Sequence, residues 1–268
     1  LVIGALRVRQ LIHRQLPVGP ITDALLGINE LEQHARELAT RHRAAKEAHL
    51  AGRRLPDPEA ASRVLHSVHA EISRAVRDGY SPSPAAEWLL DNFYVISAGI
   101  RDLKGSMPPG YYRELPKLVN GRMQGYPRVY ALALELIAHS DSRIDVETIE
   151  RFLSAYQSAA PLTIGELWAV PTFIRIGLTE NLKYLALQVL NTQREGQEAA
   201  DWLSGLLQEV KHSSLDIEGL LAARARPLRR ISAAFATELL YRLRNEGTDA
   251  APLSEWLDQR LAAIGTSA

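Results

Sequence analysis

Cysteine is missing from the 268-residue sequence. Disulfide bonds, thiolate metal sites and cysteine nucleophiles are therefore excluded, and a reducing compartment such as the cytoplasm is permitted. Net charge is missing too, because 31 Lys and Arg residues balance 31 Asp and Glu residues. No long-range field draws the whole chain toward nucleic acid or anionic lipid. We therefore expect no nucleic-acid partner.

Long apolar runs do not occur either. The longest stretches, 131–137 and 167–176, are interrupted by Glu135 and Arg175. They fall far short of the ~20 apolar residues that span a bilayer. The opening LVIGAL precedes its basic residues, which is not the order of a signal peptide. We expect no transmembrane helix and interpret the chain as a fragment of a larger protein.

What the sequence does contain is apolar periodicity of the helical kind. The spacing of Ile174, Leu178, Leu182, Leu185 and Val189 predicts a helix that keeps one face buried for roughly four turns. Strand-like alternation is nowhere sustained, and the composition, 46% hydrophobic and 23% charged, is that of a globular protein. The fold class that we predict is all-α, an irregular multi-helix bundle of about ten helices with no sheet.

Capping residues indicate where these helices begin. Asp57 and Ser83 each precede a proline, which suits the first helical position. Thr163 and Glu166 have the spacing of a capping box. Pro171, further along that helix, removes a backbone donor and predicts a kink or break. The predicted helices lie near residues 3–15, 23–50, 58–78, 84–103, 111–118, 127–139, 146–159, 164–192, 196–210 and, in two pieces, 216–262.

Aromatic and charged residues stand close together between Pro84 and Leu190. The sequence there contains PAAEWLLDNFYVI, PPGYYRELPKL, GYPRVYALALELIAHSDSRID and LTIGELWAVPTFIRIGLTENLKYLA. With these separate blocks in this order, the segment resembles the amino-terminal region of cyclic β-1,2-glucan synthases. The resemblance makes residues 84–190 the family-like core and 191–268 the trailing helices of a single helical domain over 1–268.

The resemblance implies a parent enzyme, a large membrane glucosyltransferase that polymerises glucose from UDP-glucose into β-1,2-glucan and closes it into a ring. This chain would be its non-catalytic amino-terminal domain, which scaffolds the glucosyltransferase module or handles the glucan chain. The implied location is the cytoplasmic side of the bacterial inner membrane, as part of a membrane protein. The implied partners are other modules of the same parent chain and β-1,2-glucan.

Catalytic motifs are missing from the sequence. Metal-dependent sugar-nucleotide transfer needs closely spaced carboxylates on a loop at the end of a strand, and Asp141 and Asp145 have neither the spacing nor the strand. No glycine-rich phosphate loop, HExxH or GxSxG motif occurs. We therefore expect no catalytic residue, no cofactor and no metal. A β-glucan-binding module and a protein-interaction bundle unrelated to glucan remain alternatives, as does a glycoside-acting enzyme that uses Glu114, Glu166 or Asp141.

One set of residues is the candidate surface for binding glucan or a protein partner. Aromatic faces can stack on sugar rings, while Arg and Glu can bind the hydroxyls. The set is Tyr111, Tyr112, Arg113, Glu114, Tyr126, Arg128, Tyr130, Glu166 and Trp168. Packing is the simpler interpretation for the tyrosines. Glu166 beside an indole could have a raised pKa and act as an acid, but the capping box already gives it a structural role.

Other polar residues have simple structural interpretations as well. His139, Asp141 and Asp145 could hold a metal, but an N-cap at Asp145 and an ion pair at Asp141 explain them more simply. A buried Glu180 is expected to bond an arginine of another helix.

Two basic patches are expected to be solvated faces. If the parent is a membrane protein, either patch could instead rest on an anionic membrane surface, and we expect this most of the second patch. The patches are Arg41, Arg43, Lys46, Arg53 and Arg54, and then Arg224, Arg226, Arg229 and Arg230.

Overall fold

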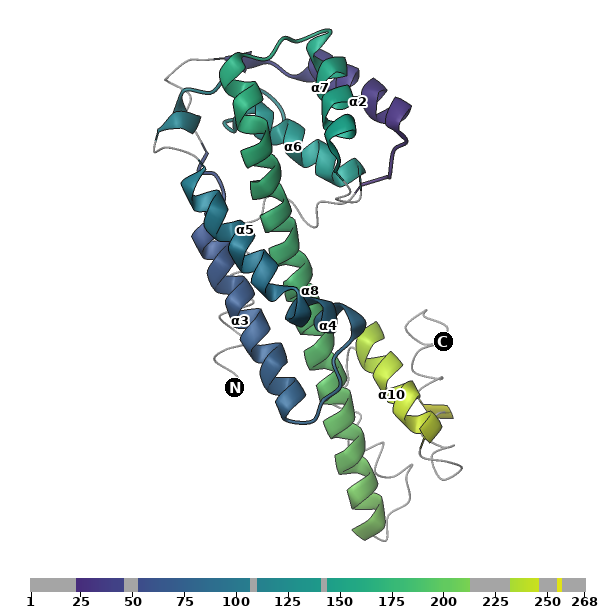
Figure 1. Cartoon of the computed structure of the whole chain (residues 1–268). Coiled ribbons are helices and arrows are strands. Elements are labelled where there is room, and N and C mark those ends of the chain that lie inside the picture. Colours follow the sequence, from purple (N-terminus) through teal and green to yellow (C-terminus); the bar gives the residue numbers. More distant parts are fainter. Residues whose placement is uncertain are drawn as a thin grey trace. The chain divides into compact units, whose positions relative to one another are not determined.

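The computed structural model describes residues 23–45, 53–106, 110–140, 144–212, 232–245 and 255–256. Helices dominate these residues (Figure 1), which confirms the all-α class. The α-helices of the described part are α2 (Ile28–Arg41), α3 (Pro58–Arg77), α4 (Pro84–Asp91), α5 (Phe93–Gly105), α6 (Arg128–His139), α7 (Val146–Gln157), α8 (Ile164–His212) and α10 (Ala233–Asn245). They are fewer than the ten that we predicted. The helix predicted near 3–15 and much of the segment 216–262 lie outside the described residues.

A small sheet corrects the prediction of a fold without strands. Strand β1 (Ala44–Ala45) pairs antiparallel with β2 (Lys117–Leu118), and Ala44 lies opposite Leu118. The segment 111–118, predicted to be a helix, instead begins with the 3₁₀ turn η1 (Tyr111–Arg113) and ends in β2. Pro116 is the physical reason, because it lacks a backbone donor and disfavours helical geometry in the residue before it. The predicted helix 23–50 likewise ends at Arg41, where the chain enters β1.

Helix α8 is longer than predicted. The two segments predicted near 164–192 and 196–210 form one helix of 49 residues, and Pro171 lies inside it without breaking it. Pro171 lies on the exposed side of the helix. The carbonyl of Leu167, which loses its helical donor at Pro171, can therefore be hydrated there.

The helix starts follow the predicted capping pattern. The Ser83 hydroxyl accepts a hydrogen bond from the backbone N–H of Ala86 at 3.3 Å. A carboxylate oxygen of Asp57 accepts from the N–H of Glu59 at 3.0 Å. Each cap satisfies a donor that the first turn of a helix leaves without a helical partner.

The chain divides into two compact units. The first contains the described residues up to His66 together with Phe93–Leu185, and the second contains Ser67–Asn92 together with the described residues from Ala186 onward. The prediction of a single domain over 1–268 stays a prediction.

The core of the first unit lies between α2, α6, α7 and the first half of α8. Figure 1 shows α2 beside α7, and these two helices pack against each other. The largest side chains that are almost fully buried here are those of Leu31, Leu136, Phe152, Tyr156 and Phe173. They come from all four helices, so each helix depends on the others for its apolar face.

The second unit has a smaller core of its own, made by the end of α8 and by α10. Leu206 of α8 and Leu239 of α10 are almost fully buried in it. Trp202 stacks on Trp256 with ring centroids 5.9 Å apart. Arg194 of α8 donates two hydrogen bonds of 2.6 Å to Glu71 of α3. This bidentate pair fixes α8 to α3 within the second unit.

Candidate functional site

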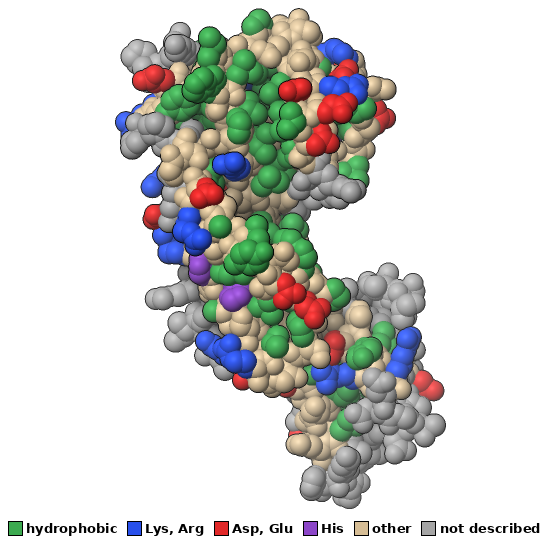
Figure 2. Space-filling view, viewed as in Figure 1, with side chains coloured by type: hydrophobic (Ala, Val, Ile, Leu, Met, Phe, Trp, Pro, Cys, Tyr) green, Lys and Arg blue, Asp and Glu red, His purple; other side chains and the backbone are tan. Residues whose placement is uncertain are grey.

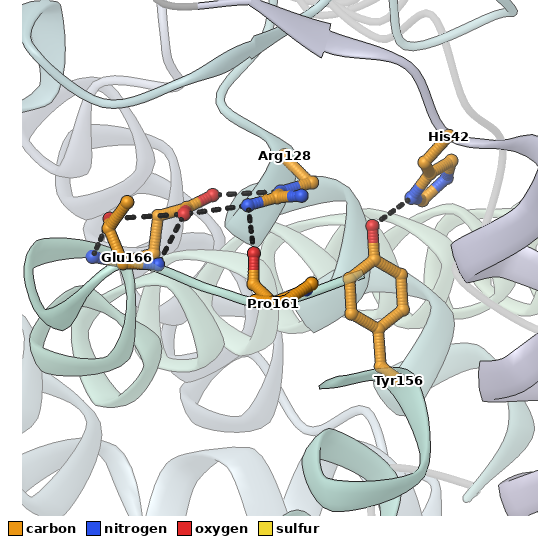
Figure 3. A network of polar contacts seen from close by, with 6 residues as sticks. His42, Arg128, Tyr156, Pro161 and Glu166 are labelled. Atoms are coloured by element: carbon orange, nitrogen blue, oxygen red, sulfur yellow. Dashed lines mark hydrogen bonds and ion pairs between the residues drawn. The ribbon is translucent and has the colours of Figure 1, made fainter. Parts of the chain in front are cut away.

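Arg128 and Glu166 form a buried ion pair at the centre of the candidate site (Figure 3). Arg128 is the first residue of α6, and its Nε donates to Oε1 of Glu166 at 2.9 Å while its Nη2 donates to Oε2 at 2.8 Å. The side chain of Glu166 is 0% exposed and that of Arg128 is 11% exposed. Arg128 also donates to the carbonyl of Pro161 at 3.0 Å. This fork geometry is the strong form of an arginine–carboxylate contact.

Glu166 also closes the predicted capping box at the start of α8. Its Oε2 accepts from the backbone N–H of Thr163 at 2.9 Å and from the Thr163 hydroxyl at 3.1 Å. In return, the N–H of Glu166 donates to that hydroxyl at 3.3 Å. Both carboxylate oxygens are therefore occupied by donors of the protein itself. Neither oxygen is presented to a substrate.

The ion pair belongs to a network that continues to α7 and to the end of α2 (Figure 3). The guanidinium of Arg128 lies 5.8 Å from the ring centre of Tyr156, and the hydroxyl of Tyr156 lies 3.2 Å from Nδ1 of His42. Burial on its own would lower the pKa of Arg128, but its hydrogen bonds to Glu166 and the charge of that carboxylate raise the pKa above its ordinary value. Burial raises the pKa of Tyr156 and lowers that of His42. The network joins four segments of the chain.

The tyrosines of the candidate set pack into the protein. Tyr126 and Tyr130 are buried, with ring centroids 5.7 Å apart, and Tyr130 contacts Phe173 at 5.6 Å. Burial raises the pKa of Tyr130. Tyr111 is half-buried, and its hydroxyl donates to the carbonyl of Gly165 at 2.8 Å. In this conformation the faces of Tyr126 and Tyr130 are covered by protein and cannot stack on a sugar.

The rest of the candidate set lies nearer the surface. Tyr112 is half-buried against the core, and Arg113 and Glu114 are exposed at the 3₁₀ turn. Trp168, two residues after Glu166 and therefore on a different face of α8, is 80% exposed. The structure therefore brings Tyr111, Arg128 and Glu166 together at one junction but leaves Trp168 in solvent.

The exposed apolar surface of α8 was not recognised in the sequence. Ile164, 76% exposed, and Trp168 stand one turn apart on α8. Pro171 and Arg175 continue the same face at helical spacing, and both are exposed. We call these four residues the α8 stripe. Figure 2 shows hydrophobic side chains gathered on the viewed face of the first unit.

A groove between α5 and α8 extends the α8 stripe. It has a volume of ≈ 310 Å³. Its lining is mainly apolar, with Asp102, Arg175 and Thr179 as its polar side chains: Val95, Ile96, Gly99, Ile100, Asp102, Arg175, Leu178, Thr179 and Leu182. The sequence predicted that the apolar residues from Ile174 to Val189 form a buried face, but only Ile174 is buried, and Leu185 is 41% exposed. Leu178 and Leu182 line the groove instead, and the partner helix that shapes it is visible only in the structure.

His139 does not join the carboxylates with which the sequence placed it. Asp145 caps α7, since its carboxylate accepts from the N–H of Thr148 at 2.7 Å, and this confirms the simpler interpretation of Asp145. That bond lowers the pKa of Asp145. Asp141 lies outside the described residues. His139 instead faces Glu135, with Nε2 lying 3.6 Å from Oε2.

Glu180 is buried, as expected, but the prediction of an arginine partner on another helix is wrong. It forms an ion pair with Lys183 of its own helix, which is also buried. Residues three positions apart lie side by side on a helix, so Lys183 is close enough to pair with Glu180 without a contact from another helix.

The basic patches are only partly described. Arg41 lies 3.7 Å from Glu37 and is exposed, as expected of a solvated face, whereas Arg53 lies over the ring of Tyr126 at 5.7 Å. Lys46 and the entire second patch, from Arg224 to Arg230, fall outside the described residues. Among the helices that the structure describes, none has the length and apolar character needed to span a bilayer.

Comparison with known proteins gives one informative relative. No family model matches the sequence. The cyclic β-(1,2)-glucan synthase NdvB of Rhizobium meliloti (strain 1021) is 34% identical over 203 residues, which cover 74% of this chain and 7% of that protein. The chain thus spans a small part of the length of the curated relative that it matches.

Proposed function

This chain is related to a region of the cyclic β-(1,2)-glucan synthases, and from that premise we propose that it is a non-catalytic helical domain that braces the glucosyltransferase module of such an enzyme. The parent enzyme would use UDP-glucose and reside in a membrane, with this domain at its amino terminus and on the cytoplasmic side. The observation that carries the proposal is the buried pair of Arg128 and Glu166.

The ion pair supports a structural role because it occupies the carboxylate of Glu166, the residue of the candidate set best suited to act as an acid. Glycoside chemistry requires two carboxyl groups ~5–10 Å apart across a cleft that holds the sugar. Glu166 is fully buried and bonded to Arg128 and Thr163, whereas Glu114 is exposed at the surface. A carboxylate used in this way fixes the start of α8 against α6, and it has no access to a sugar.

The α8 stripe is the surface that we propose for docking. Ile164 and Trp168 lie one turn apart on the same face of α8 and are both exposed, and tryptophan is enriched at the energetic centres of interfaces. The occupant that we propose is another module of the parent polypeptide, since 7% of the relative's length corresponds to the matched region. The groove between α5 and α8 gives such a module an apolar recess beside the stripe.

The proposal is tested in a full-length synthase that carries this region. Trp168→Asp places a charge on the α8 stripe, and the matched control is Trp88→Asp on α4, where the indole is 55% exposed. We expect Trp168→Asp to lower incorporation of labelled UDP-glucose into glucan at least about tenfold, the effect of losing ~1.4 kcal/mol of docking energy. Trp88→Asp should leave incorporation unchanged. If both variants lower glucan synthesis equally, the α8 stripe is not the docking surface.

A second experiment tests the non-catalytic part. The purified chain is incubated with UDP-glucose, and its products are separated by chromatography. We expect no glucan from the chain alone. Glucan synthesis by the chain alone would overturn the proposal.

Glucan handling remains the second candidate function. The exposed indole of Trp168 favours it, because Arg175 lies on the same face of α8 about two turns further along. Titration with β-1,2-glucooligosaccharides should then change the tryptophan fluorescence of the chain, and Trp168→Ala should abolish the change. A flat response at millimolar sugar would leave protein docking as the function of the stripe.

A further inference from the structure

We propose that His34, Glu135 and His139 form a binding site for a divalent transition-metal ion, with zinc as the best fit. Their ligand atoms all lie within 4.8 Å of one another. His34 comes from α2, whereas Glu135 and His139 stand one turn apart on α6. All three residues belong to the first unit.

The spacing of the ligand atoms suits tetrahedral zinc. Nε2 of His34 lies 2.9 Å from Oε2 of Glu135, and Nε2 of His139 lies 3.6 Å from the same oxygen. Zinc binds histidine nitrogen and carboxylate oxygen at about 2.0–2.2 Å, so neighbouring ligand atoms of a tetrahedral site are about 3.3 Å apart. The two distances to Glu135 therefore differ from this value by only a few tenths of an ångström, and the two histidine ligand atoms lie within 4.8 Å of each other.

The tautomer of His139 is set by a contact on the other side of its ring. Nδ1 lies 2.7 Å from the carbonyl oxygen of Ala24, which can only accept, so Nδ1 carries the proton. In the neutral ring, Nε2 then directs its lone pair toward the carboxylate of Glu135. A lone pair facing a carboxylate calls for a cation between them. A backbone carbonyl that orients a histidine in this way is also the usual outer contact of a metal ligand.

The two helices that supply the ligands are held together by the backbone. The N–H of Asp23 donates to the carbonyl of Ala138 at 3.2 Å, and the N–H of Leu26 donates to the carbonyl of His139 at 3.1 Å. The segment that leads into α2 is thereby attached to the end of α6. The ligands are preorganised, which reduces the entropy that binding would cost.

The site is open on one side. The side chain of Glu135 is 32% exposed and that of His34 is 19% exposed, so an ion can enter from solvent and keep a water as its fourth ligand. The carboxylate of Glu135 and the two imidazoles are ligand types that zinc binds.

No spacing in the sequence brings all three ligands together. His34 and Glu135 lie 101 positions apart, and our expectation of no metal weighed His139 only with Asp141 and Asp145. Two ligands at positions i and i+4 of a helix are a familiar half of a zinc site. The third ligand becomes visible only when α2 is placed beside α6.

Zinc binding is tested on the full chain after removal of metals with EDTA and without a histidine tag. Calorimetric titration with zinc chloride should give one ion per chain. The melting temperature should rise by about 5 °C or more when zinc exceeds the dissociation constant a hundredfold. Cobalt(II) should develop the visible d–d absorption of a tetrahedral site.

Variants assign the ligands. His34→Ala and His139→Ala should each weaken zinc binding at least about 100-fold, because even outer contacts of a metal site are worth 10–100-fold. His66→Ala is the matched control, since His66 is exposed on α3 and bonds a carbonyl of its own helix. Its zinc affinity should equal that of the unchanged chain. Glu135→Gln preserves side-chain shape and keeps the test valid if an alanine variant fails to fold.

The proposal is overturned if zinc produces neither heat nor a shift in melting temperature. It is also overturned if Glu135→Gln and the foldable histidine variants bind zinc as tightly as His66→Ala.

Discussion

Arg128 and Glu166 lie 38 positions apart and meet through two parallel hydrogen bonds of 2.9 and 2.8 Å. The contact fixes the first residue of α6 against the first turn of α8. A buried pair of this kind contributes little net stability relative to apolar residues that fill the same space, but removing one partner leaves the other charge buried and alone. Replacing one of the two residues should therefore lower the stability of the chain strongly, whereas replacing both with apolar residues should lower it much less.

Glu166→Ala should lower the free energy of unfolding by about 3–5 kcal/mol, because it leaves the buried guanidinium of Arg128 without an opposite charge. Urea unfolding followed by circular dichroism measures the loss. Arg63→Ala is the control, since Arg63 contacts Glu59 at 3.9 Å and both side chains are largely exposed, and it should stay within about 0.5 kcal/mol. If the double variant Arg128→Met, Glu166→Leu is as unstable as Glu166→Ala, the explanation by an orphaned charge is wrong.

Gly177→Ala should destabilise the chain by about 1–3 kcal/mol although alanine favours helices. A Cβ at Gly177 would lie 2.5 Å from Cδ1 of Ile137 and 3.2 Å from Cδ2 of Leu134. The side chain of Ile137 would have to move, and it has little room to do so because it is fully buried. Gly99→Ala in α5 is the comparison, because its Cβ would meet nothing within 4 Å. That variant should gain up to about 1 kcal/mol. The same change in stability at both glycines would show that the helix contact does not control the outcome.

Stability should fall as the pH drops below about 6.5, the ordinary pKa of histidine. Burial lowers the pKa of His42 in the folded chain. Below 6.5 the unfolded chain therefore takes up a proton at His42 that the folded chain resists, and stability is lost as the pH falls toward the lowered pKa. The urea midpoint between pH 7.5 and 5.5, measured in EDTA, tests this. His42→Gln should reduce the slope, and an unchanged slope would exclude His42 as its source.

Trp168→Ala should leave the free energy of unfolding within about 0.5 kcal/mol, because the indole is 80% exposed. Phe173→Ala, on the buried face of the same helix, should cost about 3–5 kcal/mol, because its ring is 0% exposed. Thermal unfolding of the isolated chain measures both. A large loss for Trp168→Ala would mean that the α8 stripe is covered within this chain and is not free to bind a partner.

Much of the fold could be predicted because its signals are local. Ser83 and Asp57 mark helix starts because their side chains cap the helices that follow, and the capping box joins Thr163 and Glu166, only three residues apart. The prediction failed where a distant segment decides the structure. Ala44 and Leu118 pair as strands because the fold brings them together, and neither stretch carries strand-like alternation.

The candidate site shows the same division between local and distant effects. The sequence identified Arg128 and Glu166 separately, but it could not indicate that they bind each other, since 38 positions separate them. Aromatic residues were chosen by type alone. Burial then distinguished Tyr130, which packs on Phe173, from Trp168, which faces solvent. A residue type indicates what a side chain is able to do, whereas its neighbours decide whether a ligand can reach it.

Helix α2 illustrates how the first unit depends on its earliest described segment. It packs on α7, buries Leu31 and Leu38 in the shared core and brings His34 to Glu135. A shortened form that started at Arg53 would expose the apolar faces of α6 and α7, remove the strand partner of β2 and leave the carboxylate of Glu135 without His34. Such a truncation should therefore be poorly folded and prone to aggregation, so any shorter version made for crystallisation should keep α2.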